Sequence, residues 1–193
     1  MTRALIGMVV AATLAVGSAP GLATELELVT VQDSAGRFLI AVPSTWRVDR
    51  SLKDRALSAK SPEPGPAPDT LEVFVRDTPV AMSPAACGSQ IAWVMRMTIG
   101  SWTTVSEGPD TIGGLAAFTR EYTWRLKTGE ERHSIQTCVT VGRRAFVIIG
   151  TTENSPLRRA RILPELSRMI ATFRPGGAPP AGDPNSGEPA KER

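Results

Sequence analysis

The stretch Arg37–Trp46 constrains most strongly what this chain can fold into. Apolar residues alternate along it, at Phe38, Ile40 and Val42. Such alternation is typical of a strand that turns one face to the core. Pro43 ends the pattern because proline has no N–H to donate to a sheet, and Trp46 follows, large enough to fold back over the strand end. We therefore expect an inner strand that ends at a corner, with later strands and two helices packed around it.

Residues 1–23 have the composition of a secretory signal peptide. Arg3 supplies a positive charge, Ala4–Val16 is a short apolar run, and Ala23 is a small residue suited to cleavage. The apolar run falls short of the ~20 residues that a membrane span needs. We expect a mature chain that is exported to the periplasm or beyond and has no transmembrane span. A leader that is kept as an anchor is the alternative.

Length and composition predict one globular domain, which we place at residues 24–173. The chain has 193 residues, of which 41% are hydrophobic and 21% charged, enough for a real core. Residues 174–193 are rich in Gly, Pro and charge and contain no aromatic residue, so we expect disorder there. The net charge is only +3 and no dense Lys/Arg block is present, which argues against a nucleic-acid partner.

Period-two patterns predict a meander of strands. We expect strands at residues 26–33, 37–42, 56–60, 70–76, 101–107, 115–124, 134–141 and 144–152. The expected connections are a turn at Gly108-Pro109-Asp110, a bend at Gly113-Gly114, a hairpin loop at residues 127–130 and a tight hairpin at Gly142-Arg143. The strand at 144–152 is apolar on both sides, so we expect it at the centre of the sheet, covered on both faces.

Two helices are expected. Ser83-Pro84 is a helix-start signal, and Gly100 would close this first helix. Its apolar residues recur at helical spacing, with Trp93 and Met97 on a neighbouring face, and we interpret all of them as core packing. Ser155-Pro156 opens a second helical region. Pro164 should break it into a short piece ending near Arg161 and a helix from Pro164 to Thr172. Four residues would pack that helix onto the sheet: Leu166, Met169, Ile170 and Phe173.

The order of these elements resembles that of the PsbP/Mog1-like superfamily, in particular its small exported bacterial members. The resemblance rests on Phe38–Trp46, on Ile112-Gly-Gly-Leu115 ahead of a long strand, and on Pro164–Phe173. It implies an α+β fold with an antiparallel sheet of about six to seven strands sandwiched between helices. It also implies a binding or accessory module with no common active site, and it supplies no functional residue for this chain.

The chain has two cysteines, Cys87 and Cys138. An even number in an exported protein favours a disulfide, which can form if the first helix packs on the sheet face that carries Cys138. Two buried thiols are the alternative. A thiol-dependent enzyme would use Cys87 near its helix N-terminus and His133, the single histidine, as base. Because His133 begins a strand beside a charged hairpin, we expect it to be a solvated surface residue instead.

The sequence predicts no catalytic residue, cofactor or metal site. Two Cys and one His are too few for a tetrahedral zinc site, and neither a phosphate-binding glycine loop nor a nucleophile elbow is present. An arginine cluster lies around the second helix, at Arg158, Arg159, Arg161 and Arg168. It could bind anionic envelope surfaces weakly, although a solvated helix face is the simpler interpretation.

We therefore expect an exported, non-enzymatic binding or accessory protein of the cell envelope, whose partner is an unidentified protein or envelope component. Two alternatives stay open: a thiol-dependent enzyme using Cys87 and His133, and a peripheral binder of anionic surfaces acting through the arginine cluster.

Overall fold

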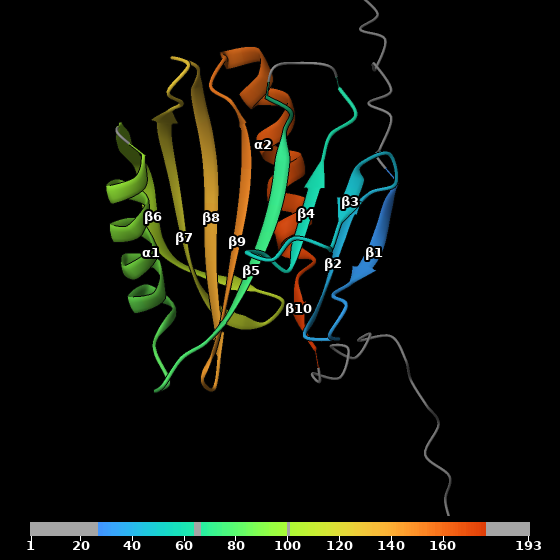
Figure 1. Ribbon diagram of the computed structural model, residues 1–193, viewed down its shortest axis with the longest axis vertical. Coiled ribbons are helices and arrows are strands. Elements are labelled where there is room, and N and C mark those ends of the chain that lie inside the picture. Colours follow the sequence, from blue (N-terminus) through green and yellow to red (C-terminus); the bar gives the residue numbers. More distant parts are fainter. Residues whose placement is uncertain (1–26, 64–66, 100, 177–193) are drawn as a thin grey trace, which may run out of the picture.

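The computed structural model describes residues 27–63, 67–99 and 101–176, so the expected leader and nearly all of the expected tail lie outside the described residues. Two antiparallel sheets and two helices make up this part of the chain (Figure 1). The large sheet has seven strands, here in spatial order: β3 (Arg47–Asp49), β4 (Leu57–Lys60), β5 (Thr70–Asp77), β9 (Arg144–Glu153), β8 (Glu131–Val141), β7 (Leu115–Arg125) and β6 (Trp102–Ile112). The expected α+β fold is confirmed.

A small, separate sheet contains the strand predicted from Phe38, Ile40 and Val42. Its strands are, in spatial order, β1 (Leu28–Gln32), β2 (Phe38–Pro43) and β10 (Arg174–Pro175). The strand β2 is thus an inner strand, as predicted, and Trp46 is buried just beyond its end. The sequence did not reveal β10, which pairs with the start of β2 and carries the ordered chain past Phe173.

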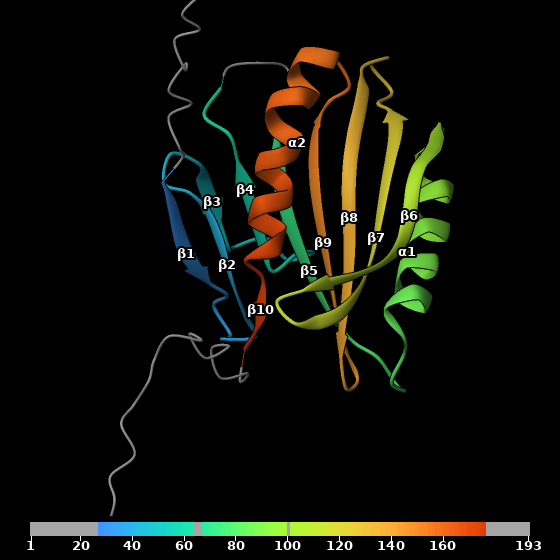
Figure 2. The same ribbon diagram turned by 180° about the vertical axis from the view of Figure 1, so that it is seen from behind.

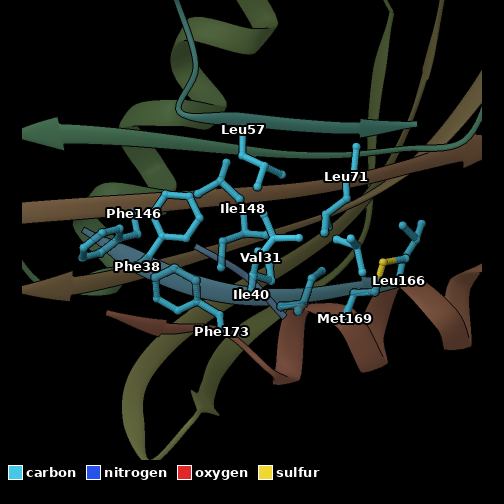
Figure 3. Packing of buried hydrophobic residues seen from close by; sticks show 14 of the residues in the cluster. Val31, Phe38, Ile40, Leu57, Leu71, Phe146, Ile148, Leu166, Met169 and Phe173 are labelled. Carbon is cyan, nitrogen blue, oxygen red and sulfur yellow. The ribbon is translucent and has the colours of Figure 1, made fainter. Parts of the chain in front are cut away.

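The main core lies between the small sheet, the helix α2 (Pro156–Ala171) and one face of the large sheet. Figure 3 shows Phe38 and Ile40 of β2 facing Phe146 and Ile148 of β9, with Met169 and Leu166 of α2 beside them. The helix lies close to β9 at Gly150. A Cβ on this residue would lie only 3.0 Å from the side chain of Leu166, so the absence of a side chain allows the close approach. Burial of these apolar side chains is the main stabilising term of the fold.

The strand β9 is central and covered on both faces, as predicted. Phe146 and Ile148 face the main core, whereas Ala145, Val147 and Ile149 belong to a second, smaller core. The helix α1 (Pro84–Thr98) covers that second face beside β6, β7 and β8, while Figure 2 shows α2 on the opposite face. The helices therefore sandwich the large sheet, as the resemblance implied.

The expected turn at Gly108-Pro109-Asp110 is wrong, because β6 runs through it. Proline is tolerated there because β6 is an edge strand, whose outward N–H groups need no partner. The chain turns instead at Gly113-Gly114, where both residues have positive φ angles of 61° and 81°. Glycine adopts this conformation without steric cost, so the expected bend is in fact the hairpin turn between β6 and β7.

The expected break at Pro164 is also wrong, because α2 is one continuous helix. Proline removes the N–H that would bond to the carbonyl of Ala160. Both residues are exposed, so this carbonyl can bind water instead. Buried side chains on both sides of the proline, Ile162 and Leu166, anchor the helix to the sheet. Packing thereby outweighs a cost of ~3 kcal/mol for proline inside a helix.

Candidate binding surface

The helix α1 begins where the sequence predicts. Ser83 is its N-cap, with the hydroxyl accepting a hydrogen bond of 3.2 Å from the backbone N–H of Ala86, and Pro84 follows. Only three of its residues are buried: Cys87, Gly88 and Ala92. All three are small, so the helix lies close to the sheet along a narrow stripe; Ile91 packs against the second core while partly buried, and Trp93 and Met97 remain outside.

The expectation that Trp93 and Met97 pack in the core is wrong. Their side chains are 66% and 75% exposed. Trp93 borders a groove of about 520 Å³ between α1 and β6. The groove is lined by Ser89, Ala92, Trp93, Arg96, Thr104, Val105, Ser106, Glu107 and Arg120. We call this groove, together with Met97, the α1–β6 surface.

Arg120 gives the groove a fixed polar floor. This β7 side chain is 5% exposed; its Nε donates to Glu107 Oε2 at 2.6 Å and its Nη1 to the carbonyl of Gly88 at 2.8 Å. The guanidinium also lies over the ring of Phe118, 5.4 Å from its centroid. A charge that is paired and stacked in this way is held in one geometry, because moving it would leave a buried charge unpaired.

Val105 adds an apolar side chain on the strand side of the groove. It lies at an irregularity in the pairing of β6 with β7, between Thr104 and Ser106, and is 55% exposed. A bulge of this kind changes the direction of a side chain and is common at sheet edges. Trp93 and Val105 therefore present apolar surface from both walls of the groove.

The structure brings the two cysteines together in the second core. Cys87 of α1 and Cys138 of β8 are both buried, in one cluster with Ala145, Val147 and Ile149. The hydrogen bond between the two thiols lowers the pKa of Cys87 and, together with burial, raises the pKa of Cys138. Both sulfurs are thiols in the structure, and the disulfide stays a prediction that this proximity favours.

The expectation that His133 is solvated is wrong. Its side chain is 1% exposed, with Nε2 at 2.5 Å from Glu121 Oε1 and Nδ1 at 3.4 Å from Asn154 Oδ1. His133 and Cys138 lie five positions apart on β8, so they point to opposite faces of the sheet. The structure therefore does not assemble the thiol and imidazole that a Cys–His enzyme would need.

The arginine cluster of α2 is partly neutralised. Arg158 donates to Asp69 Oδ2 at 2.5 Å and pairs with Glu63, which also accepts from Arg161 at 2.5 Å. These contacts hold Glu63 and Asp69, which precede β5 in the chain, against the start of α2. Arg159 and Arg168 belong to the same helix, and binding of an anionic surface through this cluster stays a prediction.

Two further properties concern the described residues only. Within them, no three His, Cys, Asp or Glu side chains gather closely enough to hold a metal ion together. Over the same ranges, neither helix combines the length and the apolar composition of a transmembrane span.

No protein-family model matches the chain, and no curated protein sequence does. Several solved structures, however, match the chain in fold. The cyanobacterial PsbP protein (CyanoP) from Synechocystis sp. PCC 6803 matches with a TM-score of 0.61 at 12% identity, over 83% of this chain and 98% of that one. LpqN, described as involved in cell envelope biogenesis of Mycobacterium tuberculosis, matches with a TM-score of 0.60 at 14% identity, over 79% and 92%.

The Ran-binding protein Mog1p of Saccharomyces cerevisiae matches with a TM-score of 0.53 at 14% identity, over 77% of this chain and 95% of that one. Each match spans nearly the whole of the other protein, so the likeness extends to the complete fold. At these identities it establishes architecture and not activity. The chain thus has the PsbP/Mog1-like fold.

Proposed function

We propose that this chain is an exported, non-enzymatic binding or accessory protein of the cell envelope, which docks a partner protein on the α1–β6 surface. The observation that carries the proposal is the exposure of Trp93 beside a groove with a rigid floor. A tryptophan this exposed leaves a large apolar area in water unless a partner covers it. The signal-peptide composition of residues 1–23 supports export.

The composition of the surface favours a protein as occupant. Trp, Met and Arg are enriched at protein–protein interfaces, and here Trp93, Met97 and Arg96 lie on neighbouring turns of α1. Aromatic side chains beside a preformed pocket are frequent hot spots. The fixed Arg120–Glu107 pair would supply polar contacts at the floor, so a partner that inserts one apolar side chain beside a polar one would fit.

A second hollow adjoins the same helix. It measures about 460 Å³ and is lined by residues at the C-terminal end of α1 and in the β7–β8 hairpin, among them Ile99, Trp124 and Leu126. Apolar surface therefore continues beyond the groove toward this end of α1. A partner protein can span both hollows, whereas a small molecule fills one of them.

The structural neighbours support an accessory role. LpqN is described as involved in cell envelope biogenesis and Mog1p as Ran-binding, so a fold of this kind serves binding in at least one other protein. The separation of His133 from Cys87 and Cys138 supports a function without thiol catalysis.

Site-directed photo-crosslinking tests the proposal. A photoreactive amino acid replaces Trp93 in cells, and the matched control carries it at Leu157, which is 88% exposed on α2. We expect a crosslink to one envelope protein from position 93 only. The purified partner should then bind the Trp93→Ala variant at least about tenfold more weakly than wild type, while Leu157→Ala binds normally.

Three results would contradict the proposal. A crosslink from position 93 only to a second copy of the chain would make the surface a dimer interface, and one only to lipid would make it a membrane contact. Equal crosslinking from positions 93 and 157 would show nonspecific contact. Trp93→Ala should unfold at the same denaturant concentration as wild type, because the residue is exposed, so weaker binding would not reflect misfolding.

A further inference from the structure

A small basic pocket lies away from the α1–β6 surface. It measures about 190 Å³ and is lined by the β3–β4 connection, by the β1–β2 turn and by Val75 of β5. Its cationic residues are Arg37, Arg50, Lys53 and Arg55, and its one acidic residue is Asp54. None of these belongs to the arginine cluster of α2. We call it the loop 50–56 pocket.

Arg37 is held in place by a buried carboxylate. Asp33 is 3% exposed and accepts from Arg37 Nε at 2.7 Å and from Nη2 at 3.0 Å, as well as from the backbone N–H groups of Ala35 and Arg37. This pairing uses one edge of the guanidinium. Asp33 does not engage Nη1, so Arg37 keeps donors for a ligand while its position is fixed.

Arg55 is held more fully than Arg37, by two carboxylates that engage its Nε, Nη1 and Nη2. Its Nη2 donates to Asp54 Oδ2 at 2.6 Å, its Nη1 to Glu72, and its guanidinium lies 5.6 Å from the centroid of the Phe74 ring. Two of the four cations in the pocket are therefore fixed before any ligand arrives. Such preorganisation lowers the entropy cost of binding.

Arg50 and Lys53 carry the charge that is left over. Both are exposed, and no carboxylate of the described residues lies within ion-pair distance of either. They extend from the same connection that supplies Arg55, so they lie at the rim of the pocket. The pocket thus combines two fixed guanidinium groups with two cations that have no protein partner in this part of the chain.

We propose that the loop 50–56 pocket binds a phosphate group. Cations on several sides suit a tetrahedral oxyanion, which presents oxygens in several directions, whereas a carboxylate is satisfied by one arginine fork. The volume admits a group of phosphate size and is too small to enclose a whole nucleotide or sugar chain. The group can come from a soluble phosphate compound or from the headgroup of a phospholipid, since both present the same oxygens.

Amide NMR spectra of the purified protein, titrated with inorganic phosphate at low ionic strength, test the site. We expect saturable shifts confined to residues 34–37 and 50–56. The Arg50→Ala/Lys53→Ala variant should bind phosphate at least about tenfold more weakly, because it removes two charge-assisted contacts. Arg47→Ala/Lys127→Ala removes the same charge from exposed residues outside the pocket and should bind like wild type.

Sedimentation with vesicles distinguishes the two sources of phosphate. If phosphatidylglycerol vesicles bind the protein, phosphatidylcholine vesicles do not, and only Arg50→Ala/Lys53→Ala abolishes binding, the ligand is a lipid headgroup. If inorganic phosphate binds and neither vesicle does, the ligand is a soluble phosphate. The proposal is overturned if neither probe binds, or if both double variants lose binding equally, since that would indicate a general charge effect.

Discussion

Arg120 of β7 donates a hydrogen bond of 2.8 Å from Nη1 to the carbonyl oxygen of Gly88 in α1. This contact ties the helix to the sheet at the floor of the groove. Gly88 lies so close to β7 that a Cβ on it would be 2.5 Å from Cδ1 of Phe118, the ring over which Arg120 lies. The glycine thus fixes the distance between α1 and the sheet, and with it the width of the groove.

Replacing Gly88 should therefore lower the stability of the protein and weaken the binding of the proposed partner in the groove. We expect Gly88→Ala to lower the free energy of unfolding by about 1–3 kcal/mol, because overpacking outweighs the gain in helix propensity. Denaturant unfolding measures this change. Gly108→Ala is the control, since a Cβ on Gly108 meets nothing within 4 Å. Equal stability of the Gly88→Ala and Gly108→Ala variants would show that α1 can move away from β7 at no cost.

The two thiols of the second core should form a disulfide in an oxidising compartment. Closing the loop between Cys87 and Cys138 should stabilise the protein by about 4 kcal/mol in the chain-entropy model. Thiol labelling of exported protein, unfolded without reductant, should find no free cysteine, and addition of dithiothreitol should lower the unfolding midpoint. Reductant should leave the unfolding midpoint of the Cys87→Ala/Cys138→Ala variant unchanged. Two labelled thiols in protein taken directly from the oxidising compartment would contradict the prediction.

Tyr122 should ionise unusually late. It is fully buried and stacked on Trp102, with 3.7 Å between ring centroids, and burial raises its pKa to about 12 despite the nearby Ser134 hydroxyl. Because Tyr122 is the single tyrosine, phenolate absorbance reports it alone. We expect a midpoint near the unfolded value of about 10 in denaturant and about 12 in the folded protein.

This shift in the pKa of Tyr122 also links stability to pH. Folding favours the neutral phenol, so the contribution is fully present below the unfolded pKa and is lost as the pH rises through the folded value. Wild type should therefore lose stability between about pH 10 and pH 12, relative to Tyr122→Phe. A folded-state midpoint equal to that of the denatured protein would show that the phenol is accessible to solvent.

Much of the fold could be predicted from local patterns. The alternation of Phe38, Ile40 and Val42 identified an inner strand, and the two-sided apolar pattern of Ala145–Ile149 identified the centre of the large sheet. These patterns are readable because the residues of a strand that face the core recur at a regular spacing along the chain. The strands β3 and β10 were missed because three and two residues are too short to show a period.

The candidate site was harder to predict, because the exposure of a side chain depends on how closely segments that are distant in the sequence pack against it. Trp93 and Met97 follow a helical apolar period, yet their side chains are exposed to solvent. The part of α1 that contacts β7 is the narrow stripe of small residues around Gly88. His133 follows a charged hairpin in the sequence, yet the pairing of β8 with β7 places Glu121 beside it, and its side chain is buried. The small buried residues at positions 87, 88 and 92 were the available signal for the true contact face.

The Asp33–Arg37 pair yields a prediction on acid stability that also tests the frame of the loop 50–56 pocket. Burial disfavours ionisation of Asp33, but Arg37 and the N–H groups of the turn outweigh it and lower the pKa of the carboxyl below 3.8. Such a group stabilises the fold above its unfolded pKa and loses this contribution as the pH falls through the folded value. We expect Asp33→Asn to cost about 1–2 kcal/mol at neutral pH, a reduced figure because Arg37 is partly exposed. The difference from wild type should shrink below about pH 4. Chemical denaturation at several pH values measures it.

The control Asp54→Asn breaks an arginine pair at an exposed carboxylate and should cost less. A difference between wild type and Asp33→Asn that stays constant down to the acid limit of folding would show that the ionised carboxylate of Asp33 does not hold the turn.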